Sequence, residues 1–163
     1  MVNKFGQRPI YRFKSSVMTH ITLEEWPTDV PLPNTFTLHE TEDGVIHPFW
    51  HIYLEPNETV EMVAGHFQSP LGLEEVMQCC DEAMQKARWN SKETVVAQER
   101  RFTLRYTNST PDKYVDINFR RPNGATTTKI QIRRVVKHPY IPPVAEEESV
   151  EENVEPALEE VTK

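Results

Sequence analysis

The sequence predicts an α+β domain in which a curved antiparallel β-sheet packs against one main α-helix. Apolar residues recur at spacings of three and four across residues 73–89, which is the period of a helix with one buried face. Apolar and polar residues alternate instead in several segments before and after that stretch, as they do in half-buried strands. Strands grouped on both sides of a single helix favour antiparallel pairing over a regular βαβ alternation.

Four strands are expected before the helix, at residues 10–14, 17–23, 35–39 and 45–54. The Glu-Asp-Gly sequence at residues 42–44 predicts a hairpin turn between the last two. A short helical turn is expected at residues 58–65. The N-terminal half should therefore supply part of the sheet.

The main helix is predicted from one apolar stripe. Its members are Leu73, Val76, Met77, Cys80, Ala83, Met84 and Ala87. Glu74 and Glu75 lie in the first turn and Lys86 and Arg88 in the last, where they complement the helix dipole. We expect the methionines of the stripe to pack against the sheet.

A three-stranded meander is predicted after the helix, with strands at residues 100–106, 113–120 and 126–136. Turn-forming residues lie between the strands, including the Asn123-Gly124 pair that is favoured in tight hairpins. These strands complete the expected sheet.

The C-terminal segment has the composition of a disordered tail. Residues 144–163 are rich in glutamate, and a Pro-rich linker at residues 139–143 precedes them. The expected organisation is one α+β domain over residues 1–138, then the linker, then an acidic tail.

Composition excludes several classes of protein. No apolar stretch approaches the roughly 18 to 20 residues of a membrane span, and the first residues lack the apolar core of a signal peptide. The two cysteines are adjacent, at Cys79 and Cys80, so a disulfide between them would be strained. We therefore expect a reduced, cytoplasmic protein with no membrane partner.

No cofactor or metal ion is expected. The chain has only five glycines and no Gly-rich phosphate loop. His47 and His51 lie four residues apart in an expected strand, about 13 Å from each other, which is too far for one zinc ion. The adjacent cysteines lack the spacing of metal-binding pairs.

Charge is distributed very unevenly along the chain. Residues 1–85 contain four Lys/Arg and thirteen Asp/Glu. Residues 86–137 contain thirteen Lys/Arg and four Asp/Glu, and residues 138–163 contain one Lys/Arg and eight Asp/Glu. The corresponding net charges are −9, +9 and −7, within a total of −7. A basic segment between two acidic ones suggests a polyanionic partner or two charged parts that neutralise each other.

The predicted meander places much of the basic charge on one face of the sheet. If the apolar residues of its strands face the core, the alternating positions carry cations, one aromatic ring and amides. The candidate nucleic-acid-binding residues are Arg101, Arg105, Tyr114, Asn118, Arg120, Lys129 and Arg133. This predicts a non-enzymatic protein that binds nucleic acid, such as single-stranded DNA or RNA, with the acidic tail competing for the basic face.

Two other functions remain open. In the first, the protein is an interaction module, such as an inhibitor or a self-associating assembly subunit, with a protein partner or a second copy of itself. In the second, it is an enzyme: the triplets His20-Ile-Thr22 and His39-Glu-Thr41 resemble the active-site signature of two-histidine phosphoesterases. That resemblance implies that His20 and His39 exchange acid and base roles on a phosphodiester.

Overall fold

The computed structural model describes residues 16–139. A single helix of more than one turn, α3 (Leu73–Lys86), and one short 3₁₀ turn, η1 (Leu23–Glu25), accompany the strands of this part of the chain. The strands are β1 (Ser16–His20), β2 (Thr37–Leu38), β3 (Glu40–Thr41), β4 (Gly44–Val45), β5 (Phe49–Glu55), β6 (Glu58–Ser69), β7 (Ser91–Gln98), β8 (Arg101–Thr107), β9 (Lys113–Arg120) and β10 (Thr128–Pro139).

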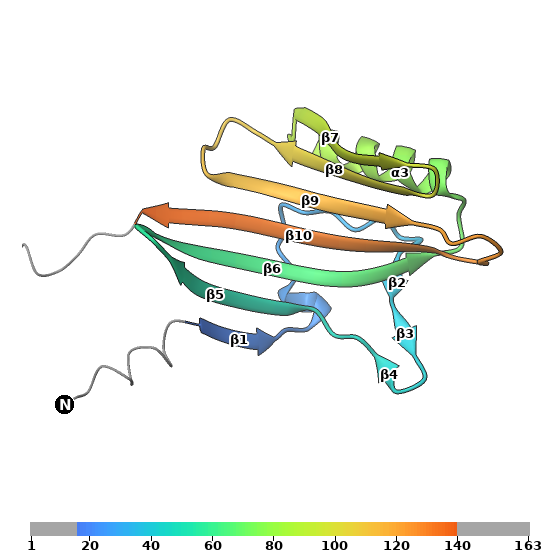
Figure 1. The fold of residues 1–163 in the computed structure, drawn as a ribbon, viewed down its shortest axis with the longest axis horizontal. Coiled ribbons are helices and arrows are strands. Elements are labelled where there is room, and N and C mark those ends of the chain that lie inside the picture. The colour runs from blue at the N-terminus through green and yellow to red at the C-terminus, as the bar shows by residue number, and fades with distance from the viewer. Residues whose placement is uncertain (1–15, 140–163) are drawn as a thin grey trace, which may run out of the picture.

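The main sheet has the strand order β1-β5-β6-β10-β9-β8-β7, with every neighbouring pair antiparallel (Figure 1). β6 and β10 pair along their whole length, from Thr128 opposite Ser69 to Pro139 opposite Glu58. β2 pairs with Phe67 and Gln68 of β6, past the point where β5 begins, and β3 and β4 form a separate small hairpin. The predicted α+β class with an antiparallel sheet is confirmed.

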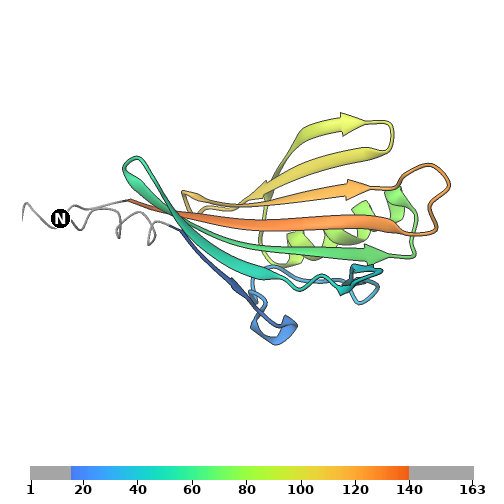
Figure 2. The ribbon, with the colours of Figure 1, turned by 60° about the horizontal axis from the view of Figure 1, so that its bottom comes forward.

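The hydrophobic core lies between α3 and one face of this twisted sheet (Figure 2). Val76, Cys80 and Met84 are the buried residues of the helix, and they belong to the predicted stripe. They share a cluster with apolar side chains of β8, β9, β10 and β6, which alternate along each strand. We refer to the opposite face of the sheet as the outer face.

The helix ends earlier than the sequence predicts, because the chain turns at Arg88. Arg88 has a φ of 73°, in the left-handed region. Its N–H donates to the carbonyl of Gln85, and the N–H of Trp89 donates to the carbonyl of Met84. This pair of bonds is a Schellman motif, which closes a helix C-terminus. It places the Trp89 ring in the core.

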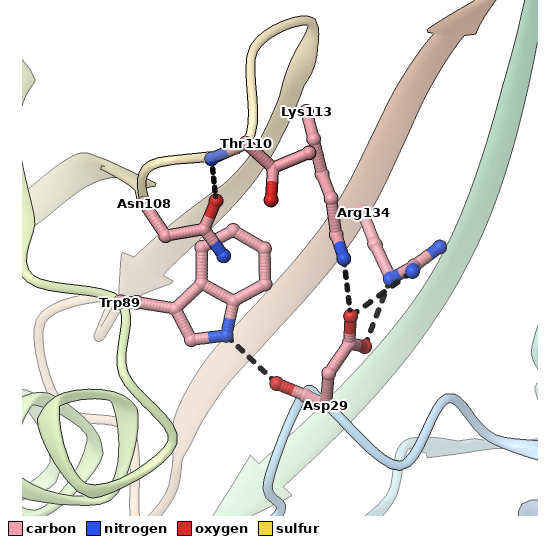
Figure 3. Close-up of polar contacts among 6 residues, drawn as sticks. All are labelled: Asp29, Trp89, Asn108, Thr110, Lys113 and Arg134. Carbon is pink, nitrogen blue, oxygen red and sulfur yellow. Dashed lines mark hydrogen bonds and ion pairs between the residues drawn. The ribbon is translucent and has the colours of Figure 1, made fainter.

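A loop from η1 to β2 packs against the core on the helix-side face and is held in place through Asp29 (Figure 3). The Asp29 carboxylate accepts hydrogen bonds from the guanidinium of Arg134 at 2.9 and 3.0 Å, and Lys113 Nζ lies 2.8 Å from it. The Asp29 carbonyl accepts a hydrogen bond from the Trp89 indole. One residue therefore joins the loop to β9, β10 and the end of the helix.

Two predictions about local structure are wrong. Residues 58–65 form the first part of strand β6 rather than a helical turn, and the predicted strand at residues 45–54 is divided between β4 and β5. β7 was not expected as a strand at all. It is an exposed edge strand with a register shift between Thr94 and Val96, so it lacks a clear apolar alternation.

The Asn123-Gly124 turn also differs from expectation. It lies within a seven-residue connection between β9 and β10 rather than in a two-residue hairpin loop. The Ala125 N–H bonds to the Pro122 carbonyl, and only Gly124 of the two central residues has a positive φ, as in a type II turn.

Other expectations fall on residues outside this structure. The expected strand at residues 10–14 and the acidic tail at residues 144–163 both lie outside the described residues. Within residues 16–139, no helix is long and apolar enough to cross a bilayer.

Candidate nucleic-acid interface

The outer face of the sheet carries all seven of the candidate nucleic-acid-binding residues. On β8, Arg105 lies between the buried Leu104 and Tyr106, so strand alternation directs its side chain away from the helix. The strand registers place the candidates in rows that run across β8, β9 and β10.

One row contains a buried acid that forms ion pairs with two of the cations. Asp116 lies opposite both Arg105 and Arg133 on the neighbouring strands. The guanidinium of Arg105 donates to the two Asp116 oxygens at 2.7 and 2.9 Å, and Arg133 Nη2 lies 3.5 Å from the same carboxylate. The hydrogen bond to Asp116 raises the pKa of Arg105. These two arginines are therefore less available to an anionic ligand than the sequence suggested.

The Tyr114 ring is also in contact with another side chain. The guanidinium carbon of Arg105 lies 4.0 Å from the centre of the ring, in a cation–π arrangement. One face of Tyr114 is consequently covered by a protein side chain and is not free to stack on a ligand.

The remaining three cations form a row of their own, which we call the basic row: Arg101, Arg120 and Lys129. Arg120 is directly opposite Arg101 on one side and Lys129 on the other. Among the described residues, none of the three forms an ion pair. Glu99, in the turn between β7 and β8, lines the same shallow depression as Arg101 and Arg120 and forms no ion pair with either. Like charges opposite each other on a sheet repel, so this row favours a bound anion.

The basic row leads into a hollow of about 300 Å³ that is lined by β6, β9, β10 and His39, the residue that follows β2. We call it the histidine pocket. The polar residues that line it are His39, His66, Asn118, Arg120, Lys129 and Gln131. His66 was not among the predicted site residues, because its segment was not predicted to be a strand and its pairing with β10 was therefore not expected.

Asn118 connects the two parts of this surface. It lines the histidine pocket and also a second depression beside Arg101, Arg105 and Arg133. Its side-chain amide donates to Thr103 Oγ1 at 2.6 Å, which fixes its orientation on the sheet. The outer face thus presents a continuous polar surface from β8 to β6.

The residues of the two His-x-Thr triplets occupy different surroundings. Thr22 caps η1 through Glu25, and Thr41 donates to the Gly44 carbonyl within the β3–β4 hairpin. His20 is an exposed residue of β1, whereas His39 lies beside His66. The resemblance to two-histidine phosphoesterases stays a prediction from sequence.

Cys80 has a packing role in the core. Burial raises the pKa of Cys80 to about 12, so its thiol remains protonated and unreactive at neutral pH. Among residues 16–139, no three His, Cys, Asp or Glu side chains are grouped closely enough to hold a metal ion.

Comparison with known proteins identifies no family for this chain. No protein-family model matches it, and no curated protein matches it. Among solved structures, it is similar to LpqN, which is involved in cell envelope biogenesis of Mycobacterium tuberculosis. The identity is 13%, the match covers 80% of this chain and 85% of that chain, and the TM-score is 0.35. Similarity at this level carries no argument about function, which must come from the residues themselves.

Proposed function

We propose that the protein binds single-stranded nucleic acid on the outer face of its sheet, with the basic row holding backbone phosphates. The observation that carries this proposal is the alignment of Arg101, Arg120 and Lys129 across three neighbouring strands without an ion-paired carboxylate among the described residues. Phosphate oxygens suit such a row because arginine binds them through charge-assisted, bidentate hydrogen bonds.

A single strand fits this surface better than a duplex does. Strands on the outer face present a broad sheet rather than a helix or ribbon that would enter a major groove. Next to the basic row, Asn118 and Gln131 are directly opposite each other and offer amide groups to base edges. Tyr114 lies farther along β9 and offers one ring face for stacking.

Arg105 and Arg133 have a secondary role in this proposal. Their pairing with Asp116 leaves the row formed by these three residues with a formal charge of +1. It would contribute to the long-range positive field more than to individual phosphate contacts.

The first experiment compares two charge-neutralising substitutions in the full-length protein. Lys129→Gln removes a cation of the basic row, and Lys86→Gln removes one from an exposed position in the last turn of α3. Fluorescence polarisation with labelled single-stranded and duplex oligonucleotides, at about 50 mM and about 200 mM salt, measures the affinity. Net charge changes equally in both variants, so a difference between them reports position.

We expect Lys129→Gln to weaken single-strand binding about three- to tenfold at low salt and Lys86→Gln to change it less than about twofold. The salt slope should fall by about 0.7 for each lost phosphate contact. Equal effects of the two variants would mean that binding is a general charge effect. Absence of any binding at low salt would overturn the proposal in favour of an interaction module with a protein partner.

A further inference from the structure

The histidine pocket brings together two imidazoles and two cations from four segments of the chain. The backbone N–H of His39 donates to the backbone carbonyl of His66 at 3.0 Å, which continues the pairing of β2 with β6 beyond Leu38. His66 lies opposite Gln131 on β10, and Lys129, two residues before Gln131, lies opposite Arg120 on β9. All of these side chains lie on the outer face.

Hydrogen bonding fixes the orientation of one imidazole. His39 Nδ1 lies 3.1 Å from Gln68 Oε1. If Nδ1 is the N–H donor to that oxygen, it carries the proton of the neutral ring, and Nε2 is then unprotonated. Protonation of Nε2 would then give His39 a second N–H donor, directed away from Gln68.

The formally charged residues that line the pocket are both positive, and Asp116, in the adjacent depression, is paired with Arg105 and Arg133. Arg120 contributes from β9 and Lys129 from β10, while β6 contributes the neutral amide of Gln68 beside His66. Glu40 follows His39 in the chain but lines a separate depression. Burial, together with the charge of nearby His39, lowers the pKa of His66, so its neutral form is favoured when the pocket holds no anion.

We propose that the histidine pocket binds a phosphate group, and that His39 and His66 take up protons when it does. Arg120 and Lys129 supply permanent positive charge, and the two imidazolium rings add N–H donors that only the protonated state has. The proposal rests on the proposed function only for the origin of the phosphate, since a nucleic-acid backbone and a small phosphate ester present the same oxygens.

Linkage between protons and phosphate sets the direction of the pH effect. A bound anion stabilises the imidazolium form and raises the histidine pKa values, so binding consumes protons. Affinity should therefore rise as the pH falls from about 8 to about 5.5, the range in which histidine titrates. A phosphodiester keeps a constant charge over that range, so the change in affinity reports the protein's groups.

The test uses the full-length protein and a short single-stranded DNA without a terminal phosphate, together with inorganic phosphate as a separate probe. Affinity for the DNA is measured at about pH 5.5 and about pH 8 for the wild type, for His39→Gln/His66→Gln and for His47→Gln. His47 is exposed just before β5 and does not line the pocket, so it is the matched histidine control. NMR of the histidine ring signals of the wild type follows the titration of inorganic phosphate.

We expect the wild type and His47→Gln to bind the DNA about tenfold more tightly at the lower pH, and the double variant to change less than about twofold. Inorganic phosphate should shift the His39 and His66 signals and raise both pKa values. A pH dependence that survives in the double variant, or unshifted His39 and His66 signals, would overturn the inference. The NMR measurement needs no substitution, so it decides even if the double variant fails to fold.

The outcomes also separate this inference from the proposed function. Salt-sensitive DNA binding without a contribution from His39 and His66 would leave the basic row as the interface and reject the pocket. Shifts with inorganic phosphate in a protein that binds no oligonucleotide would support the pocket and reject the nucleic-acid function. The natural ligand would then be a small phosphate ester.

Discussion

Asp29 holds together parts of the chain that are far apart in sequence. Its carboxylate bonds to Arg134 and Lys113, and its carbonyl accepts the Trp89 indole N–H. Partial burial raises the pKa of Asp29, but the hydrogen bonds and charges of Arg134 and Lys113 outweigh that effect and hold the pKa below its usual value. Ionised Asp29 therefore stabilises the folded state.

The Asp29→Asn substitution should destabilise the protein by about 1–3 kcal/mol at pH 7, because two half-buried cations lose their charged partner. A carboxyl whose pKa is lower in the folded state contributes stability above its unfolded pKa of about 4. That contribution is lost as the pH falls through the lower, folded-state pKa. Urea denaturation at pH 7 and about pH 3 should show the difference between wild type and variant shrinking in acid. Asp43→Asn, in the exposed β3–β4 turn, is the control and should have little effect at either pH.

At the scale of elements, the C-terminus of α3 contains a residue, Arg88, in a backbone conformation that is unfavourable for a side chain with a Cβ atom. Arg88 occupies the left-handed position of the Schellman motif, where glycine is the usual residue. A residue with a side chain is less stable than glycine at positive φ, because its Cβ then lies close to the following carbonyl oxygen.

Arg88→Gly should therefore stabilise the protein by about 0.5–1 kcal/mol, which denaturant unfolding would measure. Arg88→Ala, which removes the same charge but keeps the Cβ, is the matched control and should not stabilise. A loss of stability with glycine would mean that the long side chain contributes more than its strained backbone costs.

The apolar stripe of the helix provides a graded test of packing. Met84 is fully buried, whereas Met77 is half-buried at the edge of the core. We expect Met84→Ala to lower the free energy of unfolding by about 2–5 kcal/mol, and Met77→Ala to lower it by less than half as much. Chemical denaturation that ranked the two in the opposite order would contradict the helix orientation.

Elements with one buried face were predictable from the sequence, and those without one were not. The helix and the meander strands show clear periods of 3.6 and 2, because one face of each packs on the core. β6 is buried on both faces: Val60 and Ala64 lie on the outer face, and Val63 and Phe67 on the helix side. Apolar residues at intervals of three and four in a strand resemble a helix, which explains the wrong prediction at residues 58–65.

The site could be predicted only in part, because alternation along a strand does not give the register between strands. Alternation along β8, β9 and β10 was enough to predict which side chains share the outer face. The register between strands was needed to see that Asp116 bonds to Arg105 and Arg133 while Arg101, Arg120 and Lys129 are left as a row. The histidine pocket depends in addition on the pairing of β2 with β6, for which the sequence contains no signal.

At the scale of the whole molecule, the charge layout leads us to propose that the C-terminal segment competes with nucleic acid for the basic row. Residues 144–163 contain eight Glu and one Lys, so their removal brings the formal net charge from −7 to zero. Because the segment is covalently attached, its effective concentration near the outer face would be high if it reaches that face.

Deleting residues 144–163 should tighten single-strand binding about fivefold at low salt, with a smaller gain at high salt because screening weakens the competition. Fluorescence polarisation of the full-length and shortened chains at two salt concentrations measures this. A chain in which the eight glutamates are replaced by glutamine keeps the length and should bind as the shortened chain does. Unchanged affinity in both would show that the acidic segment does not reach the interface.

The position of β10 in the sheet affects how the protein can be synthesised. β10 lies between β6 and β9, yet it is the last of the described strands to leave the ribosome. A nascent chain that has emerged only as far as β9 holds two incomplete sheets, each with an unpaired edge where β10 will insert. Such edges pair readily with other chains, so the interval before residue 139 emerges is when this protein is most exposed to aggregation and most in need of a chaperone.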